Sequence, residues 1–210
     1  SNSCTDSTKI SVTVYPKPII DFSINNDTQC LSTNSFLFTN KSSISSGSLS
    51  YLWRFGNGIT STALNPTYKY NIADNYTVTL IATSGFACAD SLSKNIIVNL
   101  SPKPKFSIND TTQCLNGNDF QFNNLSNDTT SVTQYLWNFG DGNTSTLINP
   151  NYSYTNPGTY IVTLYVTNSN SCTDSTKISV TVYPKPIIDF SINNDTQCLS
   201  TNSFLFTNKS

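Results

Sequence analysis

The 210-residue chain contains no histidine and no methionine, and only 11% of its residues are charged. Without histidine, no Ser-His-Asp type of nucleophile can be assembled, and no pair of carboxylates is set apart as in a glycosidase. The net charge of -1 offers no basic surface to nucleic acid or to an anionic membrane. No run approaches the ~18 apolar residues of a membrane helix. We therefore predict no enzyme, no cofactor, no metal site and no nucleic-acid partner, and no membrane segment within these 210 residues.

What the sequence does contain is a repeat of 84 residues. The aromatic stretch 135–142 (Tyr-Leu-Trp-Asn-Phe-Gly-Asp-Gly) recurs at 51–58 as Tyr-Leu-Trp-Arg-Phe-Gly-Asn-Gly, and Trp137 lies 84 positions after Trp53. Adjacent repeats are similar, but alternate repeats are identical where they overlap. A period of this size, with aromatic core residues in each copy, indicates a row of separate domains rather than a thin solenoid.

The repeat also sets the expected domain boundaries. The prolines of Pro16-Lys17-Pro18 stiffen the joint between domains, because each fixes φ and favours an extended residue before it. We predict complete domains at 18–101 and 102–185. Residues 1–17 are then the last strand of a preceding domain, and residues 186–210 are the first strands of the next one.

Short alternating apolar segments separated by turns predict an all-β protein made of β-sandwiches. Residues 25–33 are expected to form a polar loop. A tryptophan on the third strand and a tyrosine at the start of the sixth favour an immunoglobulin-like sandwich, in which Tyr76 and Tyr160 occupy the tyrosine-corner position. The inward positions predict the core: Trp53, Phe55, Tyr76, Val78, Leu80, Trp137, Phe139, Tyr160, Val162 and Leu164.

The linked motifs Trp-Asn-Phe-Gly-Asp-Gly (137–142), Asn-Pro-x-Tyr-x-Tyr (149–154) and Pro-Gly-Thr-Tyr-x-Val-x-Leu (157–164) resemble the polycystic kidney disease (PKD) domain, an immunoglobulin-like β-sandwich. The first repeat departs from the pattern: Arg54 and Asn57 replace the usual acidic residues. The resemblance implies tandem sandwiches that form an extended fibre of beads on a string. The departure removes the expectation of a ligand role for that turn.

The Tyr-Pro-Lys-Pro joints and the Thr-Gln-Cys phrases are also similar to giant repeat-built surface proteins of Bacteroidota, including gliding-motility adhesins that leave the cell by type IX secretion. This resemblance implies an extracellular, cell-surface location. The predicted function is the shaft of a large secreted adhesin, which supplies length, stiffness and protease resistance. Two alternatives remain open: an array that binds glycans or proteins by multivalency, and a spacer in a secreted hydrolase. Partners are the neighbouring repeats, with lateral self-association and a surface glycan or protein ligand left open.

Six cysteines occupy two positions per repeat, and the lack of histidine and of Cys-x-x-Cys favours disulfides over a metal site. One pairing joins Cys30 to Cys88 and Cys114 to Cys172 within repeats. The other joins Cys30 to Cys172 between repeats, so that Cys88 and Cys114 bond to repeats outside the chain.

We prefer the pairing between repeats. In immunoglobulin topology the two cysteine positions lie at opposite ends of a sandwich, ~25 Å apart, whereas the Cα atoms of a disulfide lie within ~7 Å. Cys4 and Cys198 pair outside the chain in either scheme.

Two weaker sites complete the predictions. Asp141 between glycines could contribute to a calcium site, but such a residue is more often part of a turn. Tyr68 and Tyr152 could stack on sugar rings, but packing at a sheet edge is the more common role of such residues.

Overall fold

The structure is a computed structural model, and it describes residues 4–126 and 131–210. Within these ranges the chain forms strands, turns and loops and has no helix, so the all-β prediction is confirmed. It follows that no described helix could cross a membrane. The chain divides into two compact units, unit 1 (Ser1–Ser101) and unit 2 (Pro102–Ser210).

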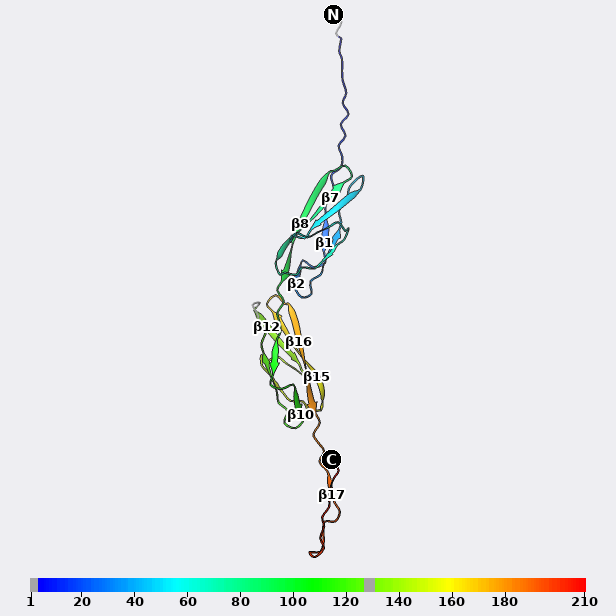
Figure 1. Ribbon diagram of the computed structural model, residues 1–210. Coiled ribbons are helices and arrows are strands. Elements are labelled where there is room, and N and C mark those ends of the chain that lie inside the picture. Colours follow the sequence, from blue (N-terminus) through cyan, green and yellow to red (C-terminus); the bar gives the residue numbers. More distant parts are fainter. Residues whose placement is uncertain (1–3, 127–130) are drawn as a thin grey trace. The chain divides into compact units, whose positions relative to one another are not determined.

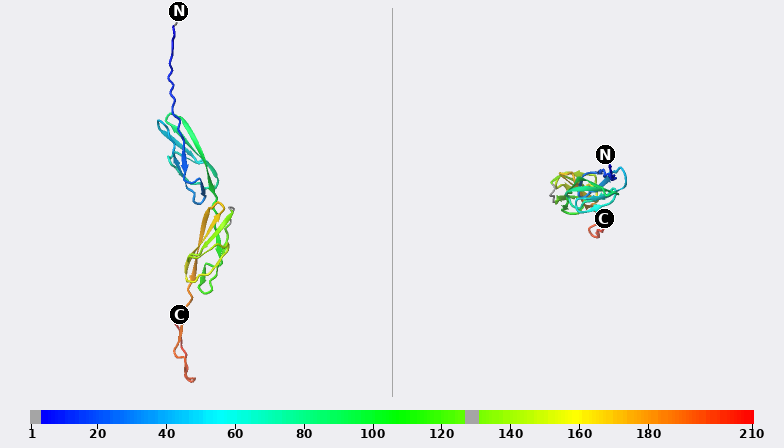
Figure 2. Two further views of the ribbon diagram at one scale, coloured as in Figure 1. Left: turned by 180° about the vertical axis from the view of Figure 1, so that it is seen from behind. Right: turned by 90° about the horizontal axis from the view of Figure 1, so that it is seen from above.

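Unit 1 is built from a five-stranded and a three-stranded sheet (Figure 1). The strand orders are β2-β8-β7-β4-β5 and β1-β3-β6. Strands β7 and β8 form a long antiparallel hairpin along which unit 1 is elongated (Figure 2). The strands are β1 (Phe22–Ile24), β2 (Thr28–Cys30), β3 (Phe36–Asn40), β4 (Leu49–Arg54), β5 (Thr60–Ser61), β6 (Thr67–Tyr68), β7 (Asn75–Ser84) and β8 (Ala89–Asn99).

Unit 2 repeats this topology strand for strand. Its sheets have the orders β10-β16-β15-β12-β13 and β14-β11-β9. The strands are β9 (Phe106–Ile108), β10 (Thr112–Cys114), β11 (Phe120–Asn124), β12 (Val132–Asn138), β13 (Thr144–Ser145), β14 (Asn151–Tyr152), β15 (Gly158–Asn168) and β16 (Thr173–Tyr183).

Two regions of identical sequence differ in structure because their surroundings differ. Residues 177–182 lie in β16, where Val182 is 2% exposed, but residues 9–14 form no strand and Val14 is 89% exposed. At the other terminus, residues 186–210 contain only the hairpin of β17 (Phe190–Ile192) and β18 (Phe206–Asn208). An alternating segment becomes a strand only when neighbouring strands supply hydrogen bonds and cover its apolar face.

Each unit has one aromatic core between its two sheets. On β7 the buried residues alternate with outward-facing, mostly polar residues, as expected for a half-buried strand. Trp53 is fully buried and meets the edge of Phe22 with ring centroids 5.0 Å apart. The equivalent pair in unit 2, Trp137 and Phe106, has the same spacing. The other buried positions of the expected core are Phe55, Tyr76, Val78, Leu80, Phe139, Val162 and Leu164.

Two sequence expectations need correction. Tyr160 is only partly buried, although its ring packs on the core and stacks on Tyr154 at 4.0 Å. Its hydroxyl donates to the exposed carbonyl of Asn156, which keeps the ring tip near the surface. The segment 25–33 is not entirely a loop, because it contains β2, which pairs in parallel with β8.

The tyrosine corners have the geometry that the sequence predicts. The hydroxyl of Tyr76 donates to the carbonyl of Ile72 at 2.9 Å, and that of Tyr160 donates to Asn156 at the same distance. Each hydrogen bond therefore ties the start of a central strand to the turn just before it.

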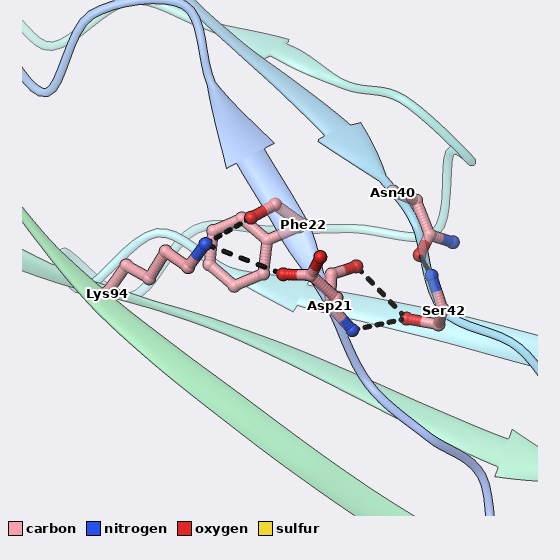
Figure 3. A network of polar contacts seen from close by, with 5 residues as sticks. All are labelled: Asp21, Phe22, Asn40, Ser42 and Lys94. Carbon is pink, nitrogen blue, oxygen red and sulfur yellow. Dashed lines mark hydrogen bonds and ion pairs between the residues drawn. The ribbon is translucent and has the colours of Figure 1, made fainter.

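A polar network holds β1 of unit 1 against β8 (Figure 3). Lys94 Nζ lies 3.6 Å from Asp21 Oδ1, donates to the carbonyl of Phe22 and lies 4.8 Å from the centroid of the Phe22 ring. The Ser42 hydroxyl donates to the carbonyl of Asp21 at 3.3 Å. In unit 2, Ile178 stands at the position of Lys94, so this ion pair is specific to unit 1.

Candidate functional site

The first candidate feature is the turn between β7 and β8 in unit 1 and between β15 and β16 in unit 2. It lies at the end where the chain enters each unit, which we call the leading end. In unit 2 this turn carries Cys172, which is fully buried. Its N–H donates to Asn168 Oδ1 at 2.9 Å, and its carbonyl accepts from the N–H of Asn168 at 3.0 Å. Ser171 adopts a φ of 60° to complete the turn. The backbone therefore holds this cysteine in a defined position.

The second feature is the segment at the trailing end of each unit, where the chain leaves. In unit 1, Cys30 ends β2 and lies opposite Asn99, the last residue of β8. Leu31 donates to the carbonyl of Asn99 at 2.8 Å, and Ser32 donates to the hydroxyl of Ser101 at 2.9 Å. Cys114 has the same place in unit 2, opposite Tyr183.

This register separates the two cysteine positions of a unit by the length of a strand. Cys88 lies eleven positions before Asn99, and Cys172 lies eleven positions before Tyr183. At ~3.3 Å per residue the separation is about 30–35 Å, whereas a disulfide requires ~7 Å between Cα atoms. This register therefore argues against a pairing within a unit.

The cysteines differ in state. Cys30 and Cys172 are disulfide-bonded. Cys4, Cys88, Cys114 and Cys198 carry free thiols.

A third feature is the aromatic turn of unit 2. The hydroxyl of Tyr152 donates to Asp141 Oδ2, and the amide of Asn143 donates to both, at 3.1 Å to Asp141 and 2.6 Å to Tyr152. Partial burial raises the pKa of Asp141, but the hydrogen bonds from Tyr152 and Asn143 outweigh it and leave that pKa below its usual value. In unit 1, Asn57 donates to Tyr68 instead, at 2.8 Å.

The two tyrosines of these turns pack against the aromatic cores of their units. The ring of Tyr68 stacks on Phe55 at 4.2 Å, and the ring of Tyr152 stacks on Phe139 at 3.9 Å, both nearly parallel. One face of each ring is therefore covered by a core residue. Packing at the edge of the sandwich accounts for both tyrosines.

A groove of about 700 Å³ lies on the outer face of the five-stranded sheet of unit 2. Leu136 and Tyr165 line it and are 42% and 37% exposed. No charged side chain lines the groove; the other lining residues are Thr133, Gln134, Tyr135, Thr146, Ile148, Thr167 and Thr173. Unit 1 has Ile81 at the position of Tyr165, so the exposed ring occurs once per pair of units.

The sequence model of the PKD domain matches residues 15–98 and 101–182, which together make up most of the chain. The chain belongs to the PKD domain family. The resemblance inferred from the aromatic motifs is therefore confirmed, and both units are PKD domains in tandem.

Two relatives of these PKD domains are bacterial proteases. Collagenase ColA of Bacillus cereus is 32% identical over 127 residues, which cover 60% of this chain and 12% of the collagenase. Pre-pro-metalloprotease PrtV of Vibrio cholerae is 35% identical over 92 residues, which cover 43% of this chain and 10% of the protease. The chain thus spans about a tenth of the length of either relative.

Solved PKD domains are also similar. The PKD1 domain of Vibrio anguillarum Epp is 30% identical, with a TM-score of 0.36, and the match covers 40% of this chain and 95% of that domain. The PKD1 domain of the Vibrio cholerae metalloprotease PrtV is 34% identical, with a TM-score of 0.33, and the match covers 41% and 99%.

PKD domains are non-catalytic, and this chain shows no catalytic domain in its sequence. In residues 4–126 and 131–210, no three acidic or cysteine side chains group as metal ligands would. The Asp141 carboxylate is instead engaged by Tyr152 and Asn143.

Two asparagines that shape these units were not predicted from the sequence. Asn34 donates to the carbonyl of Tyr70 and accepts from its N–H, at 2.9 and 2.7 Å, and Asn118 does the same with Tyr154. A repeated asparagine 36 positions before a repeated tyrosine was the available signal, but asparagine is so frequent in this chain that the pattern was hidden.

Proposed function

We propose that these PKD domains form part of the shaft of a large secreted surface protein, an adhesin of the Bacteroidota gliding-motility type exported by type IX secretion. The observation that carries the proposal is the gap-free 84-residue repeat in which alternate copies are identical over 42 residues. A shaft requires copy number and regular joints, whereas a set of different binding sites would require different loops. Homology to non-catalytic regions of bacterial proteases is consistent with a structural or spacer role.

We further propose that Cys30 of unit 1 bonds to Cys172 of unit 2. The proposal is supported by the register, which puts Cys30 at the trailing end of its own unit and Cys172 in the leading turn of its own unit. It is also supported by the bonded state of both cysteines. Closing a loop of this length contributes about 5 kcal/mol in the chain-entropy model. Repeated along an array, the same link would limit bending at every joint.

Immunoelectron microscopy of the source cells tests the shaft. An antibody against the 168-residue pair of units should label thin surface filaments at an axial spacing of about 70–90 Å, from strand rise and a short extended linker. Label in the medium, together with a protease domain in the full gene, would instead support a spacer in a secreted hydrolase.

A second candidate is a binding array, which the outer groove of unit 2 favours. An exposed Tyr165 among threonines, with no charged lining residue, suits a neutral glycan. Glycan-array binding that Tyr165→Ala abolishes and Ile81→Ala preserves would support this function. If both variants bind like the parent chain, the groove is not the site.

A further inference from the structure

The linker that leads into unit 1 is bound to the surface of that unit. The ring of Tyr15 stacks on the ring of Phe86 with centroids 4.0 Å apart and planes 11° apart. Two residues further on, Lys17 Nζ lies 3.0 Å from Asp90 Oδ2. The Lys17 side chain and the N–H of Ser91 hold the pKa of Asp90 below its usual value. Two different interactions thus attach one linker to the β7–β8 turn and to the start of β8.

The turn is shaped to present Phe86. Ser84 Oγ accepts from the N–H of Phe86 at 3.3 Å and from that of Cys88 at 3.2 Å, and Ala87 adopts a φ of 63°. Gly47 lies beneath the ring: a Cβ on it would lie 3.5 Å from Phe86 Cε2. That distance is an ordinary van der Waals contact, and the positive φ of Gly47, +92°, is what favours glycine there. The Phe86 ring is 46% exposed and stacks on Tyr15.

Unit 2 keeps Asp174 at the position of Asp90 but lacks the other residues of this contact. Asn170 stands for Phe86 and Ser131 for Gly47, and the linker before unit 2 has Asn99 and Ser101 in place of Tyr15 and Lys17. Ser101 is bound to unit 1. Its hydroxyl accepts a hydrogen bond from the Ser32 N–H and donates one to the Ser32 hydroxyl, each at 2.9 Å. The two kinds of linker are therefore held differently.

We propose that Phe86 and Asp90 form a docking site for the Tyr-Pro-Lys-Pro linker of the preceding repeat, so that joints of two kinds alternate along the array. In one kind of joint, the linker stacks on the following unit through Tyr15 and Phe86. In the other kind, asparagines replace both rings, and Ser101 bonds to Ser32 of the preceding unit. The docked segment is short and stiff because Pro16 and Pro18 flank Lys17. The proposal requires tandem PKD units but not an adhesin, so it stands or falls separately from the proposed function.

The chain contains its own control for this proposal. Tyr15 and Tyr183 each begin a Tyr-Pro-Lys-Pro segment. Within these 210 residues, the turn that carries Phe86 follows Tyr15, and no equivalent turn follows Tyr183. In the full chain labelled with 3-fluorotyrosine, we expect the ¹⁹F resonance of Tyr15 to be displaced by the facing ring and that of Tyr183 not to be. Assignment follows from single Tyr→Phe variants.

Phe86→Ala should move the Tyr15 resonance toward the position of an undocked tyrosine and reduce the docked-to-free ratio roughly 2- to 12-fold, the range for an aromatic pair. The matched variant Asn170→Ala, in the equivalent turn of unit 2, should leave Tyr15 unchanged. Phe86→Ala also changes the turn itself, so a second variant leaves the turn intact. Tyr15→Ala should change the ring resonances of Phe86. Equal resonances for Tyr15 and Tyr183, or no response to either variant, would overturn the proposal.

Discussion

Gly140 and Gly142 allow the aromatic turn of unit 2 to be tested with a pair of matched substitutions. Both glycines have positive φ, +85° and +98°, a region that costs an alanine about 1 kcal/mol or more. They differ in the space around them. A Cβ on Gly140 would lie 2.8 Å from the carbonyl oxygen of Ile161 and 2.9 Å from its nitrogen, whereas nothing lies within 4 Å of a Cβ on Gly142.

Gly142→Ala should therefore lower the free energy of unfolding of unit 2 by about 1 kcal/mol. Gly140→Ala adds a clash with the backbone of β15, which cannot move aside as a flexible side chain could, and overpacking of this kind costs a further ~1–3 kcal/mol. The total of about 2–4 kcal/mol is a large part of the stability of a small domain.

Urea unfolding of the full chain, followed by amide NMR signals of each unit, measures this difference. With a slope of ~1 kcal/mol per molar urea, unit 2 should unfold about 2–4 M earlier in Gly140→Ala and ~1 M earlier in Gly142→Ala. The midpoint of unit 1 serves as the internal reference. Equal shifts for the two variants would show that the close approach of the turn to β15 does not constrain the fold.

Three further substitutions test individual hydrogen bonds. Asn118→Ala leaves polar groups of Tyr154 and Leu115 unpaired and should cost unit 2 about 3 kcal/mol, while exposed Asn116→Ala should cost almost nothing; similar urea midpoints would contradict this. Tyr76→Phe removes the bond to the Ile72 carbonyl and should cost unit 1 about 1 kcal/mol, measured in the same titration; an unchanged midpoint would count against the tyrosine corner. Asp141 has a folded-state pKa below its usual value, so its stabilisation is present above about pH 4, the unfolded-state value, and is lost as pH falls through the folded-state value. Asp141→Asn should consequently destabilise unit 2 at pH 7 and make its stability less dependent on pH below 4, and a parallel pH profile for parent and variant would refute this role.

Much of the fold could be predicted from the sequence because each unit alternates regularly. Trp53 and Val78 face inward from strands whose outward-facing residues are mostly polar, so the period of two identified both strand and face. Strand β2 was missed because its three residues, Thr28–Cys30, include no apolar alternation, and its pairing with β8 is parallel and nonlocal. A local sequence pattern does not predict which distant strand a segment pairs with.

The ends of the units were harder to predict than their cores. The positions of Cys30 and Cys172 suggested disulfides, but which cysteines can meet depends on strand register. The stack of Tyr15 on Phe86 joins residues 71 positions apart and has no counterpart in the other repeat. Comparison of the two repeats position by position, rather than of their shared motif, was the signal that could have indicated it.

The most direct test of the proposed shaft is the identity of the cysteine bonded to Cys30. Residues 1–42 and 169–210 are identical, so Cys4 and Cys198 should first be replaced by serine to make the peptides of Cys172 and Cys30 unique. Digestion under non-reducing conditions with trypsin and a second protease that cleaves before Asp141 then separates the Cys114 and Cys172 peptides.

Mass spectrometry of this digest should find the Cys30 peptide joined to the Cys172 peptide, and Cys172→Ser should release it. A peptide joining Cys30 to Cys88, or free Cys30 in the oxidised chain, would contradict a shaft whose units are stapled end to end.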